Sequence, residues 1–231
     1  MVETVKKNDF VEISYTGRAN GEIFDSNREE DLQKINPREE EKKDKEQKKT
    51  IIALGQGMIV PGLDKELEGK EVGKEYKIQV KSKDAFGSRR KELIRTIPLK
   101  MFTEKKVTPY PGMVLALDNS LVRVITVSGA RVITDFNNPL ASKDLEYDVK
   151  IVRKVEDDKE KIDSLFVFLM QFIPEYEIVN EKKEVILKGP RALEPFVDGF
   201  GEKFEGLIGK KLVFQEKKLD RKDGVESTLG E

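Results

Sequence analysis

The side chains that could do chemistry in this chain are hydroxyls, carboxylates and lysine amines, because its 231 residues include no histidine, cysteine or tryptophan. Without cysteine the chain has no disulfide, thiolate nucleophile or zinc finger. Without histidine it has no Ser-His-Asp triad, HExxH metal site or imidazole base. An enzyme of this composition must use the remaining groups and the backbone, or work without proton transfer.

Five short blocks in the first 87 residues combine aromatic, small and polar residues. They read Val11-Glu12-Ile13-Ser14-Tyr15-Thr16-Gly17, Asn20-Gly21-Glu22-Ile23-Phe24-Asp25-Ser26, Leu54-Gly55-Gln56-Gly57-Met58-Ile59-Val60-Pro61-Gly62-Leu63, Val72-Gly73-Lys74-Glu75 and Ala85-Phe86-Gly87. The apolar members could wall a pocket. Asp25 could orient Tyr15, act directly on a ligand, or make a purely structural hydrogen bond.

Other classes of site are not supported by the sequence. No phosphate-binding GxxxxGK[ST] loop occurs, and Gly55-Gln56-Gly57 lacks the third glycine of a dinucleotide loop. The acidic runs lack EF-hand spacing, so we expect no metal and no cofactor. The formal net charge of −1 argues against nucleic-acid binding as the main function.

The distribution of apolar residues predicts a cytoplasmic protein without a membrane segment. The longest apolar run, Leu165 to Met170, is far shorter than the roughly 20 residues that span a bilayer. The start of the chain is charged and lacks the apolar region of a signal peptide. Charged residues make up 38%. This share of charged residues exceeds the average of about 25%, which is typical of thermophile proteins and equally of very soluble cytosolic ones.

Strands, turns and one short helix are predicted around the five blocks. Alternating apolar and polar side chains predict strands, and Asn20-Gly21 is a strong hairpin signal. Leu63 to Glu68 has helical composition, with Gly69 placed to end it. The strands are expected at Phe10 to Tyr15, Ile23 to Asp25, Thr50 to Gly55, Tyr76 to Val80 and Leu145 to Val155.

A charged segment interrupts this part of the chain between Asn27 and Thr50. Of its 24 residues, 16 are charged, and only Leu32 and Ile35 could anchor it. So little apolar surface cannot offset the entropy of ordering. We therefore expect a mobile loop or a solvated helix.

Residues 88–135 have the pattern of a separate small β unit. Three strands are expected, at Val114 to Leu117, Leu121 to Val127 and Arg131 to Thr134. Turns at Asp118-Asn119-Ser120 and Ser128-Gly129 would join them.

The C-terminal part predicts an α-β-β-α-β unit. Asp158 could cap a helix that runs to about Ile173, and five apolar residues from Phe196 to Ile208 have helical spacing. Between them, Tyr176 to Asn180 and Glu184 to Leu187 read as a hairpin. Leu212 to Gln215 is a last strand, and the tail from Asp220 is expected to fray.

The five blocks, in this order and spacing, resemble the FKBP-type peptidyl-prolyl isomerase family. The delay of the last strand to Leu145, after Asp135-Phe136-Asn137-Asn138-Pro139-Leu140-Ala141-Ser142-Lys143, is similar to SlyD-type and archaeal long FKBPs with a chaperone domain inserted in the flap. The resemblance covers about residues 5–155, and the remainder resembles the extra domain of the archaeal long type. It implies an α+β fold, with an antiparallel half-barrel sheet wrapped on a short helix, an inserted β domain and a C-terminal α/β domain. The implied boundaries are 1–87 with 136–155, 88–135 and 156–231.

The resemblance also implies a prolyl pocket. Its catalytic residues would be Tyr15, Phe24, Asp25, Ile59, Phe86 and Tyr147, and its further substrate-binding residues Met58, Val60, Leu63 and Leu140. Leu63 stands where many members have a tryptophan floor, and Phe86 where many have a tyrosine that bonds the substrate. Asn138 and Ser142 replace the common His and Gly of the NHxLAGK stretch. These departures bear on the level of activity and on inhibitor affinity.

The implied reaction is rotation about an X-Pro amide bond in unfolded or nascent polypeptides. It breaks no bond, so it needs none of the absent side chains. The resemblance further implies that exposed apolar residues of the insert bind unfolded chains; the candidates are Leu93, Ile97, Met101, Phe102 and Met113. Two alternatives stay open: a holdase with a degraded pocket, and a dimerisation or ribosome-docking scaffold carried by the Phe-rich C-terminal part.

Overall fold

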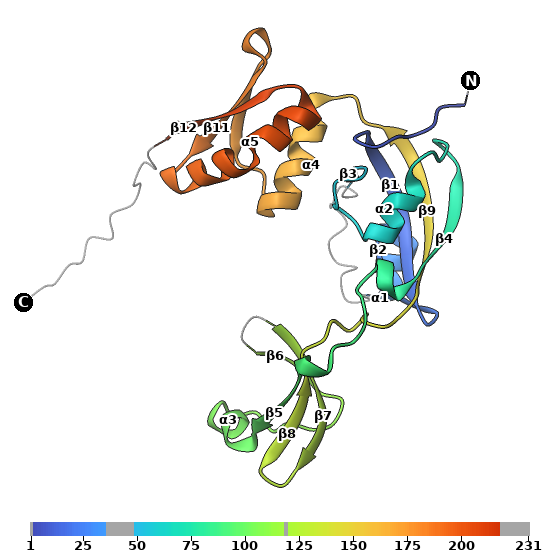
Figure 1. Ribbon diagram of the computed structural model, residues 1–231, viewed down its shortest axis with the longest axis vertical. Helices are drawn as coiled ribbons and strands as arrows, with labels where there is room; N and C mark the ends of the chain where they lie inside the picture. The colour runs from blue at the N-terminus through green and yellow to red at the C-terminus, as the bar shows by residue number, and fades with distance from the viewer. Residues whose placement is uncertain (1, 36–48, 118–119, 218–231) are drawn as a thin grey trace, which may run out of the picture.

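Three β-sheets form the framework of the protein in the computed structural model, which describes residues 2–35, 49–117 and 120–217 (Figure 1). One sheet belongs to the N-terminal half and to β9, one to the insert, and one to the C-terminal part. Helices are few and mostly short. The α+β class predicted from the sequence is therefore confirmed.

The N-terminal sheet is antiparallel, with the strand order β2-β1-β9-β4 and with β3 also paired to β1. Asn20 and Gly21 have φ values of 52° and 81°, as the predicted tight hairpin between β1 and β2 requires. Strand β9 follows the insert in the chain, yet it lies between β1 and β4 in this sheet. The sheet is therefore complete only when the chain returns from the insert. The strands are β1 (Phe10–Ala19), β2 (Glu22–Ser26), β3 (Thr50–Ala53), β4 (Glu75–Val80) and β9 (Leu145–Lys154).

The helix α2 (Pro61–Leu67) packs against this sheet and contributes two side chains to its core. Leu63 and Leu67 are buried in one cluster with side chains of β1, β3, β4 and β9. Gly62 allows the close approach, because a Cβ there would lie 2.4 Å from Cγ1 of Val80. Gly69 follows the helix with φ +77°, where it was expected to end it.

The charged segment after β2 begins with a helix, α1 (Glu29–Ile35). Asp31 on this helix is buried and accepts a hydrogen bond from Oγ1 of Thr16 at 2.6 Å, as well as one from Lys34 at 2.8 Å. A single paired carboxylate therefore anchors a helix that offers few apolar contacts. The rest of the predicted loop, residues 36–48, lies outside the described residues.

The insert contains a four-stranded antiparallel sheet of order β5-β8-β7-β6. Its elements are β5 (Ile94–Pro98), α3 (Leu99–Glu104), β6 (Val114–Leu117), β7 (Ser120–Ser128) and β8 (Arg131–Asp135). Strand β5 and helix α3 are additional to the three strands that the sequence pattern predicts. Its core is small, with Phe102, Val124 and Val132 as its buried members. The turn at 118–119 lies outside the described residues.

The C-terminal part consists of α4 (Asp158–Met170), β10 (Glu175–Val179), β11 (Glu184–Gly189), α5 (Glu194–Ile208) and β12 (Lys211–Glu216). The N-cap of α4 is Asp157, not Asp158, because the Asp157 carboxylate accepts the Glu160 N–H. The helix ends at Met170, before Ile173, since Gln171 adopts φ 64°. Strand β12 runs parallel to β11. The predicted frayed tail lies outside the described residues.

Helix α5 forms in spite of Gly199, Gly201 and Gly206. Its aromatic face packs into the core, where the ring centroids of Phe204 and Phe166 lie 6.1 Å apart. Burial of these rings outweighs the roughly 1 kcal/mol that each glycine costs relative to alanine.

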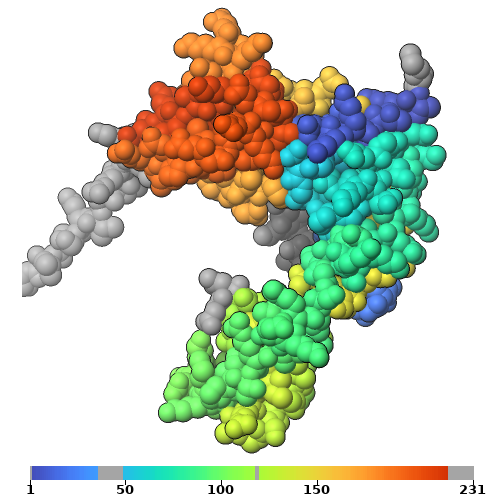
Figure 2. Space-filling model, in the orientation of Figure 1, coloured from blue at the N-terminus to red at the C-terminus, as the bar shows by residue number. Residues whose placement is uncertain are grey.

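The C-terminal part packs against the N-terminal sheet, whereas the insert projects from it. Phe10, Ala53 and Val155 share one buried cluster with residues of α4 and α5, among them Ile162 and Phe204. Figure 2 shows the molecule hollowed between the insert and the C-terminal part. Among the described residues, no helix is both long and apolar enough to cross a membrane.

Candidate active site

The hairpin of β1 and β2 brings Tyr15 and Asp25 together. The Tyr15 hydroxyl donates a hydrogen bond to Oδ2 of Asp25 at 2.8 Å. Tyr15 is half-buried against the first core cluster, and Asp25 is exposed. The pair therefore lies at the boundary between the apolar core and the solvent.

Two further aromatic rings lie beside Tyr15. The rings of Phe24 and Tyr147 meet edge to face, with centroids 5.9 Å apart, and the rings of Tyr15 and Tyr147 have centroids 6.4 Å apart. Gly17 makes room for them, because a Cβ there would lie 2.8 Å from Cζ of Phe24 and 2.9 Å from Cε1 of Tyr147. A residue without a side chain is thus required under the aromatic group.

The Gly-rich turn before α2 presents Met58, Ile59 and Val60 to the same cluster. The buried carboxylate of Asp64, on α2, holds this turn. Its two oxygens accept the N–H groups of Gly55 and Gly57 at 2.8 and 3.2 Å. The turn is thereby fixed to the helix that carries Leu63.

The segment between the insert and β9 supplies the last wall. Leu140 packs against the first core cluster, and the Asn138 side chain accepts its N–H at 2.8 Å. Ser142 has φ 64°, and its N–H donates to the carbonyl of Gly87 at 2.8 Å. This bond ties the segment to the turn that carries Phe86.

The structure therefore brings nine of the ten predicted pocket residues together and leaves one apart. Tyr147 and Leu63 are buried members of the first core cluster, six others pack against it, and Asp25 is bonded to Tyr15. Phe86 is 38% exposed and is not among the residues packed on that cluster. The six are Tyr15, Phe24, Met58, Ile59, Val60 and Leu140.

Both tyrosines of the group are held in the neutral form. Burial, followed by the hydrogen bond to Asp25 and the charge of Asp25, raises the pKa of Tyr15 well above its usual range. Burial and then the charge of Asp25 do the same for the pKa of Tyr147. Tyr15 thus remains a hydrogen-bond donor at neutral pH. The site therefore combines apolar walls with a Tyr15 hydroxyl that stays protonated at neutral pH.

Three residues that support the site were not predicted from the sequence. Besides Gly17 and Asp64, Asn27 bridges to β1 on both sides of Ser14. Its Oδ1 accepts the Tyr15 N–H at 2.7 Å, and its Nδ2 donates to the Ile13 carbonyl at 2.7 Å. The only feature of the sequence that could have indicated this role of Asn27 was its position directly after the second strand.

The surface predicted on the insert needs one correction. Phe102 is 3% exposed and forms the centre of the insert's core, because α3 turns it inward against Val124 and Val132. Met101 is 54% exposed, whereas Ile97 and Met113 pack partly against that core. Leu93 is half-buried. Other apolar side chains that are largely exposed on the insert are Tyr110, Val114, Leu121 and Ile125.

Comparison with known proteins shows the family. The profile of FKBP-type peptidyl-prolyl cis-trans isomerases matches residues 2–152. The chain therefore belongs to this family of enzymes. The match ends before the C-terminal part.

Within the family the chain is similar to short-type and SlyD proteins. The short-type peptidyl-prolyl cis-trans isomerase of Methanocaldococcus jannaschii is 29% identical over 151 residues, which cover 65% of this chain and 94% of that protein. The SlyD isomerases of Haemophilus influenzae and Treponema pallidum are 30% and 34% identical over 115 and 110 residues. These matches cover 47% and 45% of this chain. They span 58% and 62% of the two SlyD proteins, which is less than two thirds of their length.

Proposed function

We propose that this protein accelerates rotation about X-Pro bonds in unfolded or partly folded polypeptides. The observation that carries the proposal is the bonded Tyr15–Asp25 pair at the edge of an apolar group that includes Phe24, Ile59 and Tyr147. The family match over residues 2–152 supports it.

The chemistry of amide rotation fits such a site. The barrier is about 18–20 kcal/mol, because the C–N bond has partial double-bond character. An apolar pocket disfavours the charge-separated resonance form that resists twisting. Binding the twisted amide more tightly than either planar isomer then supplies the rate increase.

Each residue has a role in this mechanism. Phe24, Ile59 and Tyr147 grip the proline ring and exclude water from the amide, with Met58, Val60, Leu63 and Leu140 completing the walls. The Ile59 N–H anchors a substrate carbonyl. Asp25 orients the Tyr15 hydroxyl, and no residue accepts or donates a proton in the reaction.

The insert is proposed to bind the client chain. The insert's core cluster has only three buried members among the described residues, and a core this small leaves much of the insert's apolar surface to solvent. Met101, Tyr110 and Leu121 are 54%, 62% and 62% exposed. Under this division of labour, residues 1–87 and 136–155 form the isomerase domain, 88–135 the chaperone domain and 156–231 a C-terminal α/β domain.

An isomerisation assay on a short Ala-Leu-Pro-Phe peptide tests the enzymatic proposal. The wild type should accelerate cis-trans exchange, and Phe24→Ala should lose most of the acceleration because the proline ring loses a wall. Phe172→Ala is the matched control, since Phe172 is 51% exposed in the C-terminal part. If the wild type gives no acceleration, the isomerase proposal is overturned.

A holdase without isomerase activity is the second candidate. The specific observation in its favour is Phe86, which is 38% exposed and lacks the hydroxyl that many family members carry there. A holdase would suppress aggregation of an unfolded protein in the same assay series while leaving peptide exchange at its uncatalysed rate.

The C-terminal part also offers a surface for a homodimer. The Phe-rich helix itself does not, because Phe204 is fully buried and Phe196 and Phe200 pack on the same core. Instead, Phe172 and Ile173, each 51% exposed, lie just beyond α4, near the half-exposed Val167 and Phe168.

A further inference from the structure

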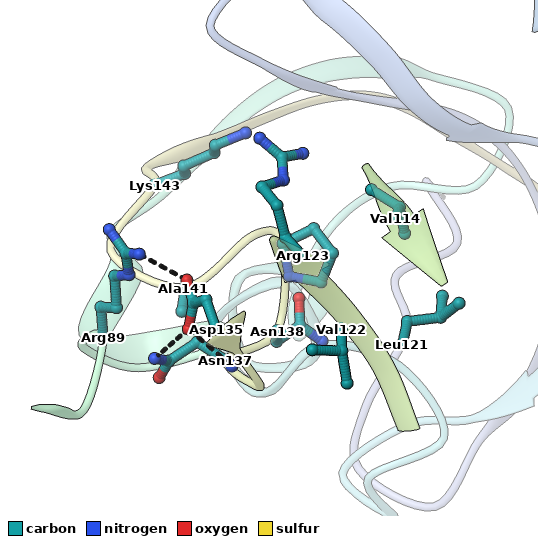
Figure 3. Close-up of a pocket in the computed structure, with 11 residues that line it drawn as sticks. Arg89, Val114, Leu121, Val122, Arg123, Asp135, Asn137, Asn138, Ala141 and Lys143 are labelled. Atoms are coloured by element: carbon teal, nitrogen blue, oxygen red, sulfur yellow. Dashed lines mark hydrogen bonds and ion pairs between the residues drawn. The ribbon is translucent and has the colours of Figure 1, made fainter. Parts of the chain in front are cut away.

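A cavity of about 210 Å³ lies where the insert joins the rest of the chain (Figure 3). Strands β6 and β7 form one side of it, and the segment that leads from β8 towards β9 forms the other. None of the ten predicted pocket residues lines it. Its lining residues are Arg89, Val114, Leu121, Val122, Arg123, Asp135, Asn137, Asn138, Pro139, Ala141 and Lys143.

The one carboxylate of this lining is already engaged. Asp135 forms an ion pair with Arg89 at 2.5 Å and accepts both the N–H and the Nδ2 of Asn137, at 2.9 and 2.6 Å. Burial acts to raise its pKa, but the bonds from Asn137 and Arg89 outweigh this and lower it, so Asp135 stays charged. Asp135 and Arg89 therefore neutralise each other.

Two further cations, Arg123 and Lys143, line the cavity. Within the described part of the chain, neither Arg123 nor Lys143 takes part in an ion pair. Their charged ends point toward one another in Figure 3. Like charges in this arrangement repel, and a carboxylate between them would be attracted by both.

Apolar side chains lie beside the two cations on both sides of the cavity. Val114 and Leu121, on the same side as Arg123, are 51% and 62% exposed, and Pro139 adds apolar surface on the side of Lys143. A small inorganic anion would leave this apolar surface in water. An acidic side chain on a polypeptide, with an apolar neighbour, would contact both the cations and the apolar surface.

The cavity is also next to the proposed prolyl pocket along the chain. Pro139 and Ala141 line the cavity, whereas Leu140 between them packs against the cluster of Tyr15 and Phe24. One extended polypeptide, at about 3.3 Å per residue, can therefore pass from one site to the other within a few residues.

We propose that this cavity binds an Asp or Glu side chain of the polypeptide whose proline occupies the neighbouring pocket. Arg123 and Lys143 are the specificity-determining residues. The proposal rests on the proposed isomerase function, and it adds a preference for clients with acidic residues in the sequence flanking the proline.

Matched peptides test this inference. They share the Ala-Leu-Pro-Phe core and carry a single Glu, Gln or Lys, moved stepwise along each flank. At the position that reaches the cavity, Glu should tighten binding about fivefold over Gln at low salt, since each partly exposed pair contributes up to about 1 kcal/mol. Lys should weaken it, and added salt should shrink the difference.

Charge variants assign the effect to the cavity. Arg123→Gln with Lys143→Gln should abolish the Glu-to-Gln ratio, and Arg123→Glu with Lys143→Glu should reverse the preference to Lys. Arg131→Gln is the matched control, because Arg131 is an exposed cation of the same insert that does not line the cavity. It should keep the wild-type ratio.

Binding is measured by fluorescence anisotropy, separately from catalysis, so that the two proposals can fail independently. A Glu preference without any isomerisation would overturn the isomerase function and keep the acidic subsite. Equal binding of the Glu, Gln and Lys peptides, or a preference that survives in the double Gln variant, would overturn the subsite.

Discussion

The hydroxyl of Tyr15 on β1 donates to Oδ2 of Asp25 on β2, 2.8 Å away across the first hairpin. In the strand register Asp25 faces Gly17, two residues beyond Tyr15, so the contact is diagonal. Because Gly17 has no side chain, the space above it is filled by Phe24 and Tyr147. The polar pair and the aromatic group therefore depend on the same strand pairing.

Removing either member of this pair should lower activity without unfolding the protein. We expect Tyr15→Phe to reduce kcat/KM on a short proline peptide about fivefold, the equivalent of one hydrogen bond of about 1 kcal/mol. Asp25→Ala should cost a similar amount, and the double variant no more than either single one, because the two act together. Additive losses would show that the two residues act separately. Tyr76→Phe, which removes the hydroxyl that accepts the Glu71 N–H, is the control.

The activity should be nearly independent of pH between about 6 and 8. No side chain of this histidine- and cysteine-free chain has an ordinary pKa in that interval. The measurement is kcat/KM on the short peptide across the interval. A steep bell-shaped profile would contradict catalysis without proton transfer.

Stability should fall at alkaline pH. The pKa of Tyr15 and Tyr147 is raised in the folded state, mainly by burial, above the value of about 10 in the unfolded chain. Their contribution is therefore complete below about pH 10 and is lost as pH rises above that value, because the unfolded chain then releases protons that the folded state retains. Denaturant unfolding at stepped pH, with tyrosinate absorbance recorded, measures this. Tyr15→Phe should make the decline shallower, and an unchanged slope would contradict it.

Two glycine substitutions should change stability in opposite directions. Gly17→Ala places a Cβ 2.8 Å from Phe24 and 2.9 Å from Tyr147, so it should destabilise the protein by about 1–3 kcal/mol and lower activity. Gly199→Ala in α5 meets nothing within 4 Å and should stabilise by up to about 1 kcal/mol. Denaturant unfolding gives both values. Equal effects would show that the aromatic group tolerates a side chain beneath it.

Deleting residues 88–135 should separate two activities. Turnover of a short proline peptide should remain largely intact, because the predicted pocket residues all lie outside the deletion. Refolding of a proline-limited unfolded protein should slow markedly, since the exposed apolar side chains of the insert are removed. Equal losses on both substrates would refute the division of labour. Met101→Ser with Leu121→Ser, at two exposed apolar positions, repeats the test without a deletion.

The apolar end of α4 should determine whether the protein is a dimer. If Phe172 and Ile173 form a homodimer contact, the wild type should have twice the chain mass in solution, and Phe172→Asp with Ile173→Asp should reduce it to one. Analytical ultracentrifugation measures both. A monomeric wild type would exclude the dimer. Tyr110→Asp, a 62% exposed aromatic position on the insert, is the control.

The sequence by itself determined the features that depend on local patterns. Alternation fixed the strands of the N-terminal sheet, and Asn20-Gly21 fixed the first hairpin, because only a few residue types adopt positive φ at low cost. The candidate pocket came from the resemblance of the five blocks to a known family, which implied its residues. The strands and the hairpin need only neighbours along the chain, and the resemblance needs only the order and spacing of the blocks.

The tertiary structure alone decided which side chains face inward. Phe102 and Met101 are adjacent and both apolar, yet one is buried and the other exposed, because α3 presents only one face to the insert's sheet. Asp31 and Asp64 look like surface charges in the sequence, but each is buried, Asp31 bonded to Thr16 on β1 and Asp64 to the turn before its own helix. Likewise Arg123 and Lys143, twenty residues apart, line one cavity only because β7 folds beside the segment before β9. Such pairings depend on contacts between distant parts of the chain, which local patterns do not encode.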